Sequence, residues 1–315
     1  MRLWRSMAAL LAAAMLAAAG PAPAQDSLSA DNGVAAKVNG EAISTYDLVQ
    51  RMRLLVLLSG LKPDEQTVGW LQRFALTGLI NDRLKTQEFA RFRPLSELDG
   101  DIDDQIRAMG RGDPARVLGP LGQDGVQADS LRAYLRGQIA WANLARGRLG
   151  GRVQIGEAQA AQAAATLNDP ATAKVRLTGL FLSDLSTGDR ASGLAMAAQL
   201  AAQIRAGASL EGLGGAFSDM SPYTAGPDGR WMTIDSLDPE VAAAIAAAPL
   251  GALGEPIETR EGVLLLVVLE RYEPGGGTPP NVTAETMAGL LKEDRLASLA
   301  GRYLRDLKSS AEISP

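Results

Sequence analysis

The sequence predicts a multi-domain protein in which all-α segments at both ends flank an α+β unit. Apolar residues recur at helical spacing through most of the first half of the chain. After Asp169-Pro170 the pattern changes to short runs of strand-forming residues that alternate with helices, and one long helix is predicted near the C-terminus. This order of segments places the strands of the chain mainly in its second half.

The first residues have the three-part pattern of a secretory signal peptide. Arg2 and Arg5 precede an apolar run over residues 7–19, and the small-residue triplet Ala22-Pro23-Ala24 follows. We therefore expect residues 1–24 to be removed by cleavage before Gln25. The alternative is an uncleaved membrane anchor, although the run is short for a membrane span.

Composition excludes several classes of chemistry. The 315 residues include no cysteine and no histidine, so disulfides, thiolate nucleophiles, Ser-His-Asp triads and histidine-ligated zinc are ruled out. The net charge of −5 argues against a nucleic-acid partner. The sequence predicts no metal site and no cofactor, and beyond the signal segment no stretch is long enough for stable membrane insertion.

The first half of the chain is expected to be helical. Residues 34–38 form a strand candidate that ends in the turn Asn39-Gly40. Helices are predicted over residues 46–58, 63–92, 96–109, 130–149 and 156–167. The Gly- and Pro-rich residues 110–125 are expected to form a loop.

The second half predicts a compact α+β unit and a final helix. Strands are expected over residues 175–182, 257–259 and 263–270, and helices over residues 191–206, 210–217 and 239–248. The glycine-rich residues 218–231 are expected to be loop and turn. After a linker at residues 274–280, a long helix is predicted over residues 284–309, and residues 311–313 close the chain.

Several motifs in this unit resemble a parvulin-type peptidyl-prolyl isomerase domain. Residues 210–221, which include Phe217-Ser218-Asp219-Met220-Ser221, are similar to the parvulin active loop. Residues 226–231 resemble the turn that precedes the parvulin tryptophan, with one residue out of step. Residues 254–259, followed by Gly262 and an apolar strand, resemble the closing hairpin of that family.

The flanking segments resemble the SurA-type periplasmic chaperones. The similarity is carried by residues 34–44, 136–157 and 303–313. It implies an all-α chaperone module, built from an N-terminal helical domain at residues 25–170 and a C-terminal segment at residues 274–315, with a parvulin-like α+β domain inserted at residues 171–273. The C-terminal helix and strand would return to the N-terminal domain, so that residues 311–313 pair near residues 35–38.

The sequence departs from the parvulin pattern at three central positions. The family's two histidines fall at Gly179 and Leu264, and its active-loop cysteine or aspartate falls at Met220. The resemblance therefore implies a degenerate isomerase site with weak or no activity. Loss of the histidines does not by itself exclude catalysis, because rotation about a peptide bond needs no permanent proton transfer.

Candidate peptide-binding residues follow from the same resemblance. In the parvulin-like domain they are Ser218, Asp219, Trp231, Leu237 and Val241, and in the helical module they are Met52, Leu55, Trp70 and Phe74. Six of them have a structural alternative: Asp219 could organise its own turn, Trp231 could be buried by packing, and the four helical residues could be ordinary core.

Together these observations predict a monomeric periplasmic chaperone that binds unfolded outer-membrane proteins or other extended peptides. Its parvulin-like domain would serve as a peptide-binding unit or a scaffold. Two alternatives remain open. One is an active peptidyl-prolyl isomerase with a histidine-free pocket, and the other is an adaptor whose parvulin-like domain binds one partner protein.

Overall fold

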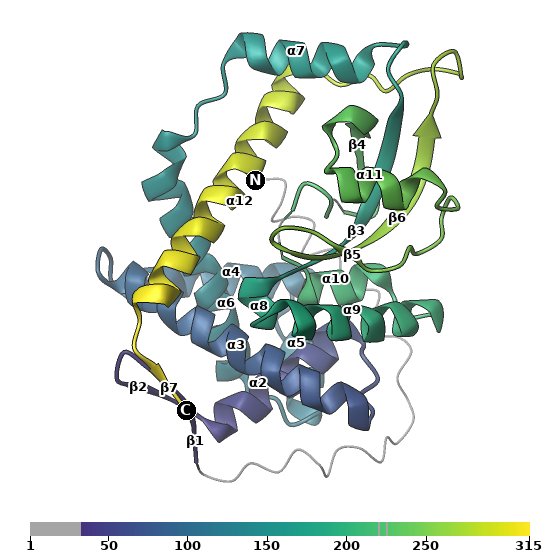
Figure 1. Cartoon of the computed structure of the whole chain (residues 1–315). Helices are drawn as coiled ribbons and strands as arrows, with labels where there is room; N and C mark the ends of the chain where they lie inside the picture. Colours follow the sequence, from purple (N-terminus) through teal and green to yellow (C-terminus); the bar gives the residue numbers. More distant parts are fainter. Residues whose placement is uncertain (1–32, 220, 225) are drawn as a thin grey trace.

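The chain forms two units that pack against each other (Figure 1). The computed structural model describes residues 33–219, 221–224 and 226–315. A helical module combines residues 34–168 with residues 284–314, and an α+β unit lies between them at residues 174–272. The predicted signal segment, residues 1–24, lies outside the described residues. Within those ranges, no helix combines the length and the hydropathy that a membrane crossing requires.

A small antiparallel sheet joins the two ends of the helical module. Its strands are β1 (Val34–Val38), β2 (Glu41–Ser44) and β7 (Ile313–Ser314), in the order β2-β1-β7. Asn39 and Gly40 connect β1 to β2 with φ angles of 51° and 82°, a left-handed pair that Asn-Gly adopts readily. Strand β7 pairs with β1 through Lys37–Ser314 and Val38–Ile313. The C-terminal strand therefore lies beside residues 35–38, where the resemblance to SurA-type chaperones implied that it would pair.

Two helices form the base of the module, and both begin at capping side chains. Helix α2 (Thr45–Ser59) starts at Ser44, which makes a capping box with Asp47, and it stops at Gly60, whose φ is 67°. Helix α3 (Glu65–Ala90) starts at Asp64, whose carboxylate accepts the N–H of Thr67 at 2.7 Å. These caps satisfy backbone groups that the first and last turns would otherwise leave unpaired.

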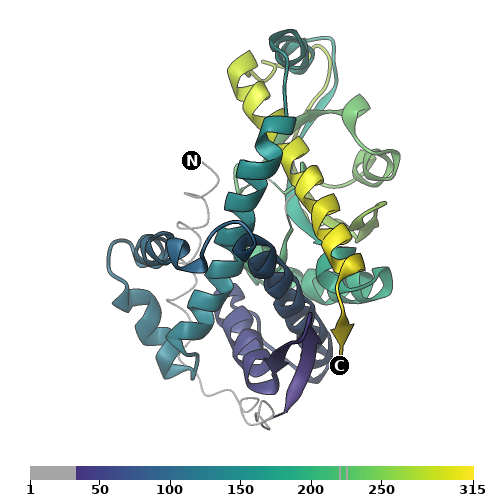
Figure 2. The same ribbon diagram turned by 90° about the vertical axis from the view of Figure 1, so that its left-hand side faces the viewer.

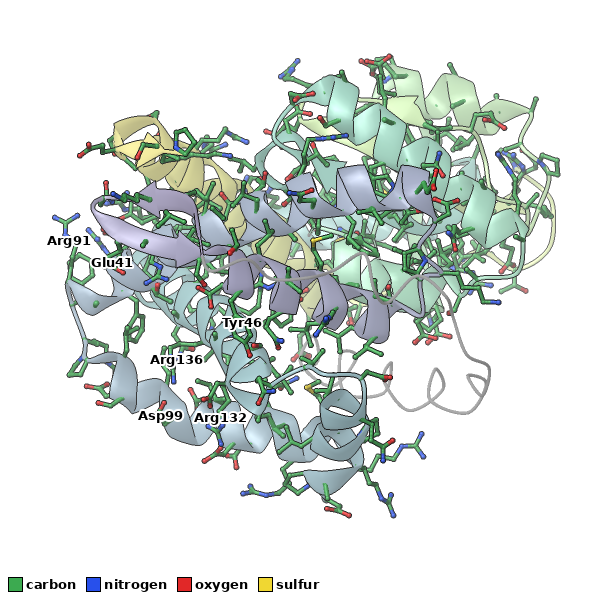
Figure 3. The ribbon with its side chains drawn as sticks, turned by 90° about the horizontal axis from the view of Figure 1, so that it is seen from below. Glu41, Tyr46, Arg91, Asp99, Arg132 and Arg136 are labelled. Atoms are coloured by element: carbon green, nitrogen blue, oxygen red, sulfur yellow. The ribbon has the colours of Figure 1, made fainter. Side chains whose placement is uncertain are left out.

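The remaining helices of this part of the module lie between residues 95 and 168, and those up to Leu144 pack around one apolar cluster. They are η2 (Leu95–Leu98), α4 (Asp99–Met109), α5 (Ala115–Gln123), α6 (Ala128–Leu144), the π-helical turn η3 (Ala145–Leu149), η4 (Gly150–Arg152) and α7 (Glu157–Asn168). Their core includes Ile102, Ile106, Leu131 and Leu135. On the underside, Arg136 of α6 reaches Asp99 of α4 at 3.1 Å (Figure 3).

One expectation for this region was wrong. Residues 110–125 contain helix α5 although Pro120 lies inside it, because Val117 and Leu121, one turn apart, are 0% and 4% exposed in the module core. Their burial outweighs the backbone hydrogen bond that proline removes. The helix expected over residues 130–149 is present, as α6 followed directly by the π turn η3.

Helix α12 (Ala284–Ser310) carries the chain back from α7 to β7 (Figures 1 and 2). Its Tyr303 ring stacks on Trp141 with centroids 5.8 Å apart, and its hydroxyl donates to the buried carboxylate of Glu88. Arg91 and Arg148 also donate to Glu88, at 2.9 and 3.1 Å. One buried acid therefore ties α12 to α3 and to the π turn.

The α+β unit is built on a four-stranded antiparallel sheet. Its order is β4 (Arg230–Thr233), β3 (Lys174–Ser183), β6 (Gly262–Tyr272) and β5 (Ile257–Glu258). The helices α8 (Asp184–Thr187), α9 (Arg190–Arg205), α10 (Leu210–Phe217) and α11 (Pro239–Ala246) follow in chain order, with the short η5 (Ile234–Ser236) before α11. Arg230 and Trp231 were expected to lie in a loop, but they pair with Leu177 and Arg176 as part of β4.

The two faces of this sheet have different partners. Alternate residues of β6 enter different clusters: Val263 and Leu265 pack with α9 and α10, whereas Leu264 and Leu266 pack with α11. The first cluster continues without a break into α2 and α3, so the α+β unit and the helical module share one core. A bidentate ion pair between Arg230 and Asp294, at 2.8 and 2.7 Å, adds a second junction, to α12.

Candidate functional site

The two positions that correspond to parvulin histidines lie on the α11 face of the sheet. Gly179 pairs with Leu266 at the centre of the β3–β6 ladder. A Cβ atom at Gly179 would lie 2.1 Å from the carbonyl oxygen of Leu265, so no side chain fits there without a backbone shift. Leu264 is 1% exposed and belongs to the core of this face. A polar side chain is therefore missing at both positions, and the backbone at Gly179 leaves no room for one.

The predicted proline-pocket residues are core residues of the same face. Val241 and Leu237 are 0% and 8% exposed, in one cluster with Leu264. Tyr223 fills the edge of this cluster, and its hydroxyl donates to a carboxylate oxygen of Asp238 at 3.0 Å. Burial raises the pKa of Tyr223 to about 12, so the phenol stays neutral. The face thus presents packed side chains where the resemblance implied a pocket.

Ser218 and Asp219 are used to hold the turn after β3. The Ser218 hydroxyl accepts the N–H of Phe181 at 3.0 Å, and the Asp219 N–H donates to the Phe181 carbonyl at 2.7 Å. The Asp219 carboxylate accepts hydrogen bonds from the hydroxyls of Ser183 and Ser186 at 2.6 and 2.7 Å. The Asp219 carboxylate therefore holds the start of α8, and not its own turn as the structural alternative for this residue proposed. Met220, the third degenerate position, lies outside the described residues.

Trp231 does not join the other candidates. It lies in β4 and packs against a cluster that includes Leu167 of α7 and Met287 of α12, and the guanidinium of Arg176 lies 5.9 Å from its ring centroid. Leu237 and Val241 belong to a different cluster, under α11. The predicted binding residues of the α+β unit are therefore split between separate clusters and do not form one site.

The four candidates of the helical module are brought together, but this chain itself covers them. Met52, Leu55 and Trp70 are 3%, 2% and 5% exposed, and Phe74 is half-buried. Phe217 of α10 makes edge-to-face contacts with Trp70 and Phe74, with ring centroids 5.5 and 5.3 Å apart. In this arrangement their apolar surface is the junction between the two units.

Two residues that the sequence did not single out are central to these surfaces. Phe217 connects the units, and Tyr223 completes the α11 face. Phe217 lies within the parvulin-like motif of residues 210–221. Its large apolar side chain at the end of a short helix could have indicated a buried contact. Tyr223 follows Ser221-Pro222 in a loop, where nothing in the local pattern distinguishes an inward ring from an exposed one.

Comparisons with known proteins match the α+β unit to a protein family and most of the chain to a chaperone. Residues 180–270 match the family model described as "Rotamase: PPIC-type PPIASE domain". The chain is 23% identical over 284 residues to the "Chaperone SurA" of Chromobacterium violaceum, an alignment that covers 87% of this chain and 65% of that protein. The chain thus spans slightly less than two thirds of the curated relative that it matches.

Among solved structures, the similarity is of low identity. A SurA-like chaperone from Campylobacter jejuni is 14% identical, with 90% of this chain and 98% of that chain covered and a TM-score of 0.37. PrsA from Bacillus subtilis is 15% identical, with 90% and 94% covered and a TM-score of 0.28. The family match and the curated relative agree: residues 180–270 form a PPIC-type, parvulin-like domain, and the chain as a whole is similar to a SurA chaperone.

Proposed function

We propose that the chain is a periplasmic chaperone for unfolded outer-membrane proteins, and that its parvulin-like domain serves as a scaffold or peptide-binding unit. Homology to SurA-type chaperones supports the general activity. The signal-peptide pattern of residues 1–24 supports export. The client class rests on the resemblance of residues 34–44, 136–157 and 303–313 to the SurA-type chaperones.

The observation that supports the scaffold role is that buried core side chains fill the α11 face of the sheet. An isomerase must bind the twisted amide of an X-Pro bond more tightly than the planar one, against a barrier of about 18–20 kcal/mol. Here Leu264 and Val241 are fully buried, and no side chain fits at Gly179 without a backbone shift. A proline ring would have to displace core side chains, and we expect that displacement to cost more than the binding returns.

The junction between the units supports the same role. Phe217, Leu213 and Ala216 of α10 are buried against α2 and α3, so the parvulin-like domain completes the core of the helical module. Removing the domain would expose a large apolar surface. A domain that stabilises its neighbour in this way is retained for structure whether or not it catalyses.

The experiment measures chaperone activity directly. Aggregation of a urea-unfolded outer-membrane β-barrel on dilution is followed by light scattering, with the purified chain at stoichiometric concentration and bovine serum albumin as the control. We expect slower aggregation with the chain only. Equal scattering with both proteins would reject the chaperone proposal.

The second candidate, an active isomerase, is favoured by the match of residues 180–270 to an isomerase family. Proline-limited refolding of a small test protein, with the chain at catalytic concentration, separates the two. We expect no acceleration. An acceleration that Val241→Phe abolishes would instead place catalysis on the α11 face.

A further inference from the structure

A cavity opens where the π turn meets the C-terminal helix. It has a volume of about 420 Å³ and lies between η3–η4 and α12, with Leu149 and Arg152 on one side and Leu299, Arg302 and Arg305 on the other. A volume of this order accommodates one or two amino-acid side chains. None of the functional candidates discussed above lies in it.

The walls of the cavity carry an excess of positive charge. Arg152, Arg302 and Arg305 line it together with one acid, Asp306. Within residues 33–219, 221–224 and 226–315, the side chains of Arg152 and Arg302 make no hydrogen bond or ion pair, and both are exposed. Arg305 contacts Glu261 of the β5–β6 hairpin at 3.4 Å. In a chain with a net charge of −5, two unpaired guanidinium groups at one cavity favour an anion.

The floor of the cavity is apolar and fixed. Leu149 is 6% exposed, and Leu299 is half-buried beside it. The ring of Tyr303 also lines the cavity, held by its stack on Trp141 and by its hydrogen bond to Glu88. A floor that is already held in place loses less conformational entropy when a ligand binds.

We propose that this cavity binds a carboxylate of an unfolded client chain, with a neighbouring apolar side chain of the client against Leu149 and Leu299. This inference rests on the proposed function, because it names how a client is held. The guanidinium fork binds carboxylate and phosphate alike, so the charge alone does not choose between them. The apolar floor favours the peptide carboxylate, because a peptide supplies an anion and an apolar group together, whereas inorganic phosphate supplies only the anion.

The experiment uses the full chain and fluorescent peptides. Three N-terminally labelled peptides share a leucine-containing sequence: one ends in a free carboxylate, one ends in an amide, and one has an amide end and an internal glutamate beside leucine. Binding is measured by fluorescence anisotropy, with inorganic phosphate as a competitor. The test variant is Arg152→Gln with Arg302→Gln. The matched control is Arg107→Gln with Arg116→Gln, because those side chains are exposed on α4 and α5.

We expect a carboxylate-bearing peptide to bind about tenfold more tightly than the amide peptide, and added salt to weaken its binding. Comparing the peptide that has a free C-terminal carboxylate with the peptide that has an internal glutamate shows which of these two carboxylates of a client the cavity binds. The Arg152 and Arg302 variant should lose this preference, while the control should keep it. Equal binding of the amide peptide, an unchanged preference in the test variant, or phosphate displacing the peptide at equal concentration would overturn the site.

The same proteins enter the aggregation assay, so that the two proposals fail separately. If the wild-type chain slows aggregation but shows no carboxylate preference, the cavity proposal is wrong and the chaperone proposal stands. If the arginine-dependent preference is present but aggregation is not slowed, the chaperone proposal is wrong and the cavity is a peptide site of another function.

Discussion

Replacing Phe217 with alanine should separate the two units of the protein. Phe217 is 2% exposed, and its ring contacts both Trp70 and Phe74 edge to face, with centroids 5.5 and 5.3 Å away. The phenyl ring belongs to α10, whereas the two partner rings belong to α3. The substitution therefore removes the α+β unit's ring from the centre of the shared core and leaves the two rings of the helical module in place.

The expected cost is about 3–5 kcal/mol in the free energy of unfolding, the range for a buried phenylalanine cut to alanine. Of this, roughly 0.5–1.5 kcal/mol per ring pair comes from the edge-to-face geometry beyond the buried area. Because the two units share one core, we expect the wild-type chain to unfold in a single urea transition, and because the loss falls at their junction, we expect two transitions for the variant. Tryptophan fluorescence and far-UV circular dichroism should then give different midpoints.

The matched control is Phe92→Ala. Phe92 is 52% exposed, and its main contact is the Arg148 guanidinium, 4.2 Å from the ring centroid. A cation–π pair at an exposed site is worth about 0.5–1 kcal/mol, so this variant should remain close to wild type with one transition. A Phe217→Ala cost below about 1.5 kcal/mol, with a single transition, would refute the assignment of a shared core.

Three further predictions concern the site and the C-terminal helix. Gly179→Ala should cost about 1–3 kcal/mol in urea unfolding, because its Cβ would overlap the Leu265 carbonyl; an unchanged midpoint would contradict the close approach. Glu88→Gln should cost about 1–2 kcal/mol, because the charge-assisted bonds from Arg148 and Tyr303 weaken, and limited proteolysis should show earlier cleavage in α12. Raising the pH from about 10 to about 12 should lower stability, since the unfolded chain loses the Tyr223 proton first; Tyr223→Phe should show a smaller fall, and an equal fall would exclude Tyr223 as a cause.

The sequence was most informative where a local rule decides the structure. Asn39-Gly40 forms its left-handed turn, Ser44 caps α2, and Asp64 caps α3, because each depends on neighbouring residues only. Helix α5 was missed for the opposite reason. Its sequence contains a proline and two glycines, and the burial that stabilises it comes from α4 and α6.

The candidate site shows the same division. Gly179 and Leu264 were identified from a motif, and both lie on one face of the sheet because strand alternation places them there. Trp231 was assigned to the same site from its motif, but β4 directs it into the cluster with α7 and α12. Whether an apolar surface such as that of Trp70 is open or covered depends on how two units dock, and no local pattern encodes that.

The pairing of β7 with β1 has a consequence for the order of folding. The N–H of Glu312 reaches the Asn39 side chain across 273 residues, and Val38 pairs with Ile313. Closing a loop of that length carries a large entropy cost, and it is possible only after the last residues have been synthesised. The edge of β1 therefore cannot pair with β7 before residues 313–314 emerge, and we expect this strand edge to be open to other chains during synthesis.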